Sequence, residues 1–282
     1  MPKKNKNYRY GKKLNYNVSA QIRYFSDIHS LIKKMSDETE KAVLGFFHKP
    51  VATKFKTQQQ EAAAMDSGIS DDAKKLIGRL RKKFEELFTT KAPIYAKKMV
   101  DQATKSSSVA LNQSIKEITQ ALSVKMDFIP KGMNQIVKGL INENVSLITT
   151  IPEQYFRNVT SAVMLSITTG TGMDQLTRNL QKYYGTVNNK ARNVASDQSR
   201  KAYNAINKQR MMAAGYQEFE WLHSGGGLHP RPDHVAMDGK IYSFSKPPVI
   251  DKKTGERGIP GQAINCKCTM RPIYRLENGE RI

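Results

Sequence analysis

The chain has 282 residues and a formal charge of +21, the balance of 46 lysines and arginines against 25 acidic residues. This length can bury the core of one large or two modest domains. The charge indicates a polyanionic partner, with a solvated basic surface as the alternative. Its 2 cysteines are too few for a disulfide framework, and no apolar run is long enough to span a bilayer. No apolar segment follows the basic N-terminus, so we predict a cytoplasmic origin, no secretory leader and no membrane partner.

Residues 1–18 contain no acidic residue and are predicted to form a flexible basic arm. Lysine and arginine contacts with phosphates give an affinity for DNA that does not depend on the base sequence, so we expect nonspecific DNA contact here. The cations of this arm are Lys3, Lys4, Lys6, Arg9, Lys12 and Lys13. A later predicted helix carries a second basic group, from which we expect the same contact: Arg192, Arg200 and Lys201.

Helical periodicity begins at Ser19, where apolar residues start to recur at three- and four-residue steps. This helix is predicted to end before Pro50. Ser70, followed by two aspartates, is predicted to cap the next helix. Pro93 is predicted to interrupt that helix, because proline cannot donate the backbone hydrogen bond of a helix interior.

Two further prolines, Pro130 and Pro152, are predicted to divide the next stretch into two helices. The second of these stops at a Gly-Thr-Gly sequence that begins at Gly170. Asp174 is predicted to cap a short helix. A separate long helix follows, for which Gly215 is the predicted C-terminal cap.

Strand signals appear only after Gly215. Asp238-Gly239 lies between two apolar segments, which predicts a hairpin, and the final INCKCTMRPIY is expected to be an extended strand. The predicted fold class is α+β, with a mostly helical N-terminal body and a small β-rich C-terminal module (residues 216–275).

Both cysteines, three of the five histidines and the single tryptophan fall in this module. In a strand, Cys266 and Cys268 would point to the same side. With His223, His229 or His234 they could complete a tetrahedral zinc site. The alternative is a pair of small buried apolar side chains, and we expect this metal-free packing, hence no cofactor.

The sequence His229-Pro-Arg-Pro-Asp-His234 contains two prolines, from which we predict a rigid turn rather than a helix. It could present Arg231 or His234 to a phosphate, or His234 as an acid–base group. The alternative is structural, with Arg231 bridging carbonyl groups and His234 bonded to Asp238 or to backbone. We favour the structural role, because no nucleophile with an adjacent base accompanies these residues.

Three segments, ARNVASDQSRKAYNAINKQRMMAAGYQEFEWLHS, RPDHVAMDGKIYSF and PGQAINCKCTMRPI, together resemble the phage head morphogenesis family of Mu F-type minor head proteins. The resemblance covers residues 128–275. Where many relatives have a threonine and a glutamate after the Ala-Arg pair, this chain has Ser196-Asp197. The pattern residues, expected to be structural, are Trp221, Arg231, His234, Asp238, Gly239, Asn265, Cys266 and Cys268.

The resemblance implies a virion component at the portal vertex or in the capsid interior, without catalytic activity. Such a protein joins the procapsid in the host cytoplasm and acts in DNA packaging or ejection. Its implied partners are the portal protein, the major capsid or scaffolding protein, and DNA. The resulting division is a basic arm (1–18), a helical region (19–127), a head-morphogenesis-like domain (128–275, with helices over 128–215) and a tail (276–282).

Two other functions remain open at this point. One is a nuclease-like or toxin-type enzyme that uses His229, His234, Asp238 and the cysteines. The other is a nucleic-acid-binding protein unrelated to virions. For the zinc alternative, the ligands we select are His223, His234, Cys266 and Cys268.

Overall fold

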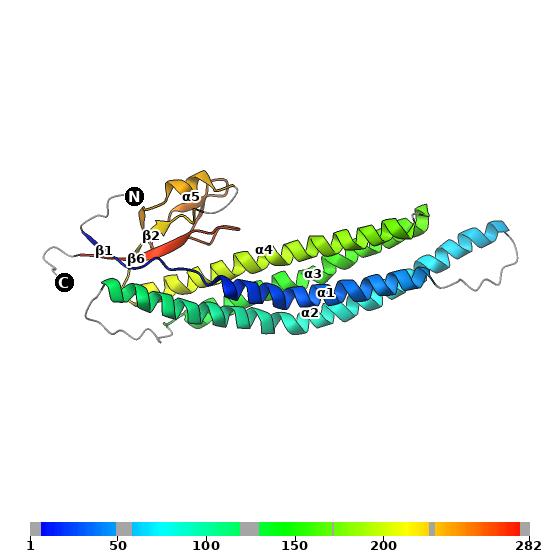
Figure 1. The fold of residues 1–282 in the computed structure, drawn as a ribbon, viewed down its shortest axis with the longest axis horizontal. Helices are drawn as coiled ribbons and strands as arrows, with labels where there is room; N and C mark the ends of the chain where they lie inside the picture. The colour runs from blue at the N-terminus through cyan, green and yellow to red at the C-terminus, as the bar shows by residue number, and fades with distance from the viewer. Residues whose placement is uncertain (1–6, 49–57, 119–129, 171, 226–228, 277–282) are drawn as a thin grey trace. The chain divides into compact units, whose positions relative to one another are not determined.

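The computed structural model describes residues 7–48, 58–118, 130–170, 172–225 and 229–276 (Figure 1). The long helices are α1 (Val18–Phe47), α2 (Gln58–Ile118), α3 (Met133–Thr169) and α4 (Met173–Ala213). The remaining elements are β1 (Tyr8–Tyr10), β2 (Glu218–Leu222), α5 (Pro232–Ala236), β3 (Ile241–Ser243), β4 (Val249–Asp251), β5 (Glu256–Arg257) and β6 (Thr269–Arg275). This arrangement confirms the predicted α+β class.

The chain forms two compact units, each assembled from separate segments. The helical unit contains residues 24–95 and 143–194. The sheet unit contains residues 1–23, 96–142 and 195–282. The predicted boundary between residues 127 and 128 lies outside the described residues, as does nearly all of the predicted tail.

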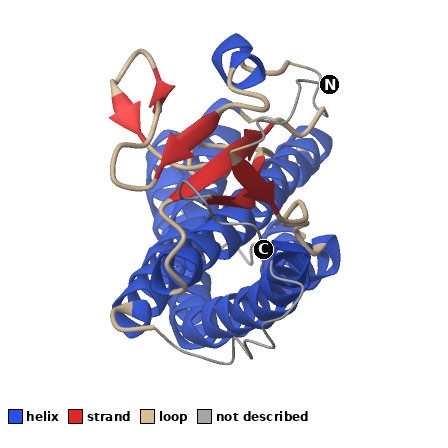
Figure 2. Ribbon diagram, turned by 90° about the vertical axis from the view of Figure 1, so that its left-hand side faces the viewer, coloured by secondary structure: helices blue, strands red, loops and turns tan. Residues whose placement is uncertain are grey.

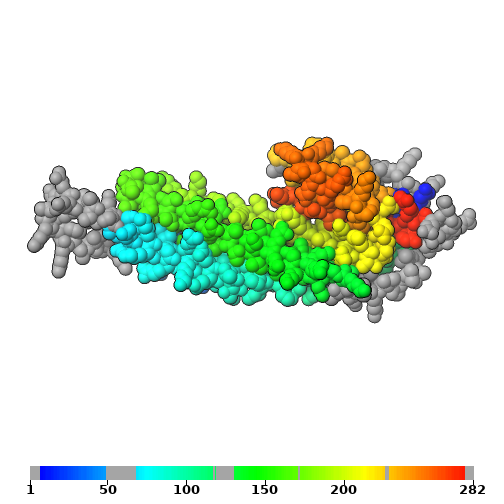
Figure 3. All heavy atoms as spheres, turned by 180° about the vertical axis from the view of Figure 1, so that it is seen from behind, coloured from blue at the N-terminus to red at the C-terminus, as the bar shows by residue number. Residues whose placement is uncertain are grey.

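The helical unit is held together by aromatic residues on the facing sides of its helices. Phe84 of α2 stacks on Phe156 of α3 with ring centroids 6.2 Å apart, and both rings are fully buried. The hydroxyl of Tyr24 donates to the side-chain oxygen of Asn144 at 2.7 Å, so its polar end is also satisfied in the core. Figure 3 shows α2 (cyan) beside α3 (green) in this unit.

The predicted helix breaks at Pro93 and Pro152 are wrong, because both prolines lie inside continuous helices. Ser70 likewise lies within α2, and α4 joins the short and long helices predicted after Asp174. A proline inside a helix lowers the stability of that helix by roughly 3 kcal/mol. Burial of a few large apolar side chains offsets this loss. The buried neighbours of the two prolines are Phe88, Ala92, Ala96, Met99, Ile148, Ile151, Tyr155 and Phe156.

The sheet unit contains a four-stranded antiparallel sheet in the order β1-β6-β2-β3, and a separate β4–β5 hairpin (Figure 2). Helix α4 leads into this sheet through Gly215, which has φ +87°. The Tyr216 N–H donates to the Met211 carbonyl at 2.9 Å, a bond typical of glycine-ended helices. The predicted C-cap is therefore confirmed. Figure 3 shows the C-terminal module (orange) against the yellow end of α4.

The described part of the predicted flexible arm is instead fixed to the sheet. Strand β1 pairs with β6, with Tyr8 opposite Arg275 (Figure 1). The Gly11 N–H donates to the Pro272 carbonyl at 2.9 Å, and Leu14 is fully buried. Among the described residues of this segment, Leu14 is the one fully buried apolar side chain, so the sequence carries no apolar periodicity here.

The final strand is also shorter than predicted. β6 begins at Thr269, so both cysteines precede it in irregular backbone. Asn265 has φ +57°, a left-handed conformation that asparagine tolerates better than most residues. The relative direction of the two sulfurs is therefore set by a turn rather than by the pleat of a strand.

Replacing Leu14 by alanine tests whether the arm belongs to the folded core. We expect a loss of about 2–5 kcal/mol in unfolding free energy, because a fully buried leucine leaves a cavity. Chemical denaturation measures this loss. Val18→Ala is the matched control, since Val18 is 51% exposed. Equal effects of the two substitutions would show that the arm is not packed.

Candidate metal centre

The helix α5 places His234 in the interior of the sheet unit. The prediction that two prolines exclude a helix is wrong, since Pro232 occupies the first turn, where its missing N–H is not needed. Arg231 is the N-cap residue, and its guanidinium donates to the Ile264 carbonyl at 2.9 Å. That bond is the structural role predicted for Arg231. The side chain of His234 is only 2% exposed.

The turn after α5 fixes the helix to strand β2. Gly239 has φ +73° and its N–H donates to the Trp221 carbonyl at 2.8 Å. The Asp238 carboxylate accepts the backbone N–H of His223, also at 2.8 Å. Asp238-Gly239 therefore joins α5 to β3, rather than forming the predicted two-strand hairpin.

The loop that carries the cysteines is fastened to α4. The Asn265 N–H donates to the Asp197 carboxylate at 2.6 Å, and Lys201 pairs with the same carboxylate at 2.9 Å. Gly261 has φ +81°, a conformation that favours glycine, and a Cβ there would lie 2.3 Å from the Asn204 side-chain nitrogen of the helix. Asp197 was not predicted as a site residue. The only signal was its place where relatives have an acid.

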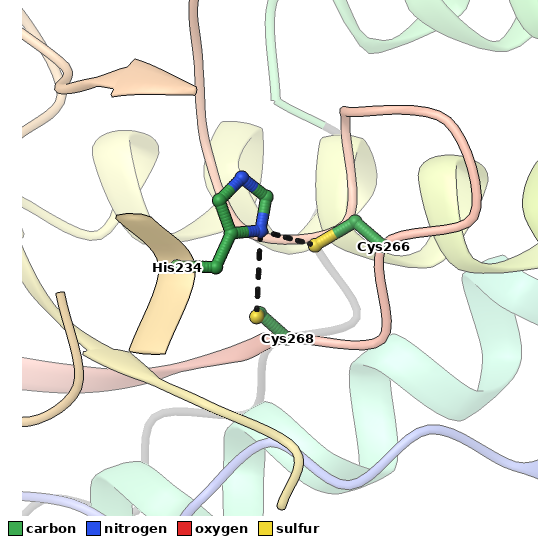
Figure 4. A group of neighbouring side chains, drawn as sticks. All are labelled: His234, Cys266 and Cys268. Carbon is green, nitrogen blue, oxygen red and sulfur yellow. Dashed lines mark hydrogen bonds between the residues drawn. The ribbon is translucent and has the colours of Figure 1, made fainter. Parts of the chain in front are cut away.

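These elements bring His234, Cys266 and Cys268 together, as Figure 4 shows. The Nδ1 atom of His234 lies 3.4 Å from the Cys266 sulfur and 3.8 Å from the Cys268 sulfur. Its Nε2 atom lies 3.0 Å from the Ile250 carbonyl, which can only accept, so Nε2 carries the proton. The lone pair of Nδ1 therefore faces the two sulfurs.

Hydrogen bonding between the two thiols shifts their pKa values in opposite directions. The hydrogen bond from Cys268, opposed by burial, lowers the pKa of the Cys266 thiol to about 5. The same hydrogen bond, with burial, raises the pKa of Cys268, while the indole N–H of Trp221 acts in the opposite direction. Of the two thiols, Cys266 therefore loses its proton more easily, and the thiolate is the form of cysteine that ligates metals.

Two more histidines border this cluster. His223 and His229 line a cavity of about 80 Å³ together with His234 and Cys266. The Nδ1 atom of His223 accepts the Gly225 N–H at 3.2 Å, which leaves its Nε2 available. Of the four ligands selected from the sequence, three thus have converging ligand atoms, and His223 lies at the border of the same cavity.

The residues proposed for acid–base chemistry have structural bonds. Both ring nitrogens of His234 have partners, and the Asp238 carboxylate holds the backbone at His223. Trp221 is fully buried with its ring edge-on to His234, at a centroid distance of 5.2 Å.

The cations predicted to contact DNA lie in different environments. Lys3, Lys4 and Lys6 are outside the described residues, and Arg9, Lys12 and Lys13 are exposed. Arg192 is exposed and its guanidinium lies 4.7 Å from the Phe25 ring centroid. Arg200 lies over the Tyr16 ring, and Lys201 is paired with Asp197. DNA contact by all of these residues stays a prediction.

Part of the chain matches a known protein family. Residues 157–271 match the family described as Phage Mu protein F like protein. This region is Mu F-like. The Mu F-like region contains every pattern residue from Trp221 to Cys268, which confirms the resemblance to a phage head morphogenesis family.

An uncharacterized protein of Haemophilus influenzae (strain Rd) is 24% identical over 267 residues, which is 93% of this chain and 55% of that protein. The chain therefore spans about half the length of this curated relative. No solved structure matches the chain. Within the described parts of the chain, none of the helices has a stretch long and apolar enough to cross a membrane.

Replacing Asp197 by alanine is expected to cost about 1–3 kcal/mol of unfolding free energy, because it removes the acceptor of Asn265 and the partner of Lys201. Asp233→Ala is the matched control, since Asp233 pairs with the exposed Lys252, and we expect a loss below about 1 kcal/mol. Thermal or chemical denaturation of both variants measures the difference. A neutral Asp197→Ala variant would contradict the proposed anchoring of the cysteine loop.

Proposed function

We propose that this protein is a minor head protein of a tailed phage that binds the portal during procapsid assembly. In this proposal it lies in the capsid interior or at the portal vertex, and acts in DNA packaging or ejection without catalysis. The observation that carries the proposal is the Mu F-like match over residues 157–271, which includes the whole clustered histidine and cysteine site. The formal charge of +21 suits a protein that shares a capsid with packaged DNA.

A basic groove in the sheet unit supports nonspecific DNA contact. Lys12 and Lys13, which follow β1, line it together with Lys105 of α2. The groove has a volume of about 620 Å³, and its other lining residues are uncharged. All three lysines are exposed. Lysine contacts with phosphate oxygens are independent of base sequence, so a groove of this kind selects charge rather than sequence.

Binding to duplex DNA is therefore expected to weaken steeply with salt and to be equal for unrelated sequences of the same length. The triple variant Lys12→Ala, Lys13→Ala, Lys105→Ala should reduce the slope of log affinity against log salt by up to about 0.9 for each phosphate that the protein no longer neutralises. Fluorescence anisotropy over a salt series measures this slope.

The matched control removes three lysines that already have acidic partners, Lys74, Lys75 and Lys97. It lowers the formal charge by the same amount and should change the slope less. Equal changes in both variants would show that net charge, rather than the groove, binds DNA. Affinity that is insensitive to salt would contradict the DNA contact itself.

Portal binding is tested by co-expressing this chain with the portal protein of the phage or prophage that encodes it. We expect the two to co-elute as a particle much larger than either chain. The sample is treated with nuclease first, because a protein of charge +21 can be bridged to other proteins by nucleic acid. Separation of the two proteins after nuclease treatment would contradict the proposed portal association.

A further inference from the structure

The distances around His234 match those of a metal-bound site. Zn–N bonds of about 2.0 Å and Zn–S bonds of about 2.3 Å at tetrahedral angles place nitrogen and sulfur about 3.5 Å apart. The observed separations from Nδ1 are 3.4 Å to Cys266 and 3.8 Å to Cys268. The three ligand atoms all lie within 4.8 Å of one another, so one ion can reach all of them.

The surroundings of His234 favour the same conclusion. Metal-bound histidines usually donate their second ring nitrogen to a carbonyl, which fixes the ring and its tautomer. The Nε2 of His234 makes this bond to Ile250 at 3.0 Å and leaves Nδ1 to bind a metal. The indole N–H of Trp221 is buried, makes no hydrogen bond of normal geometry among the described residues, and acts on the Cys268 sulfur. A metal-bound thiolate is the kind of acceptor that would satisfy it.

Burial and charge indicate which metal fits. The three side chains are between 2% and 5% exposed, so a site with a large net charge would be costly. Two thiolates and a neutral imidazole balance a divalent ion in charge. Thiolate and imidazole ligands in tetrahedral geometry are typical of Zn²⁺, whereas Mg²⁺ and Ca²⁺ prefer oxygen.

We infer that His234, Cys266 and Cys268 bind a structural Zn²⁺ ion, with His223 as the fourth ligand. His223 lines the cavity beside the cluster and its backbone is held by Asp238. His229 lines the same cavity but is exposed. The ion would connect the end of β2, helix α5 and the loop before β6. This inference reverses the metal-free packing expected from the sequence, and it does not rest on the proposed function.

Metal content of untagged full-length protein, purified under reducing conditions without chelator, tests the inference. We expect about one zinc per chain by mass spectrometry of metals. Cobalt exchanged into the site should show the absorption of tetrahedral, thiolate-bound Co²⁺. A strong chelator should lower the melting temperature, and added zinc should restore it. Zinc below roughly a tenth per chain, with no thiolate–cobalt absorption, would overturn the inference.

Single substitutions assign the ligands. Cys266→Ser, Cys268→Ser and His223→Ala should each lower zinc affinity at least about tenfold, and His229→Ala should leave it unchanged. The cobalt spectrum of the intact protein keeps the test valid if a cysteine variant fails to fold. Zinc affinity that falls in His229→Ala but not in His223→Ala would overturn the assignment of the fourth ligand.

Discussion

The pairing of β6 with both β1 and β2 is the constraint on which the sheet unit depends. β6 contributes Met270 and Ile273 to the core and lies between strands from opposite ends of the chain. The bond from the Thr269 hydroxyl to the Leu14 carbonyl, at 2.5 Å, joins the first residue of β6 to the N-terminal arm. Without this strand, the arm has no partner for its backbone groups, and β2 is left with β3 alone.

The histidine and cysteine cluster follows from that pairing. Cys268 directly precedes β6, so the position of the strand fixes one end of the cysteine loop, while Asp197 and Gly261 fix the loop to α4. His234 arrives from the opposite side on α5, whose connection to β2 is set by Gly239. Three independently anchored segments thus meet at one point, as a binding site requires if its geometry is to be held without the ligand.

The charge of the chain is divided between internal and external roles. Lys201 and Arg200 interact with Asp197 and Tyr16 inside the sheet unit, where they stabilise packing. Lys12 and Lys13 face an open groove instead. The formal charge counts packed and exposed cationic side chains equally, although only the exposed side chains can release counterions from DNA. The number of cations available to a polyanion is therefore smaller than the composition suggests.

The sequence by itself determined the α+β class, the first helix, the glycine ends of α3 and α4, and the Mu F-like pattern, because local periodicity and caps encode them. It also offered a site of cysteines and histidines, as the alternative to metal-free packing of the two cysteines. Only the tertiary structure decided that Pro93 and Pro152 lie inside helices, that the arm forms a strand, and that His234 rather than another histidine faces both sulfurs. These outcomes depend on burial against residues that are distant in the sequence. The free energy of that burial exceeds the local helix and strand preferences, and the local sequence carries no sign of it.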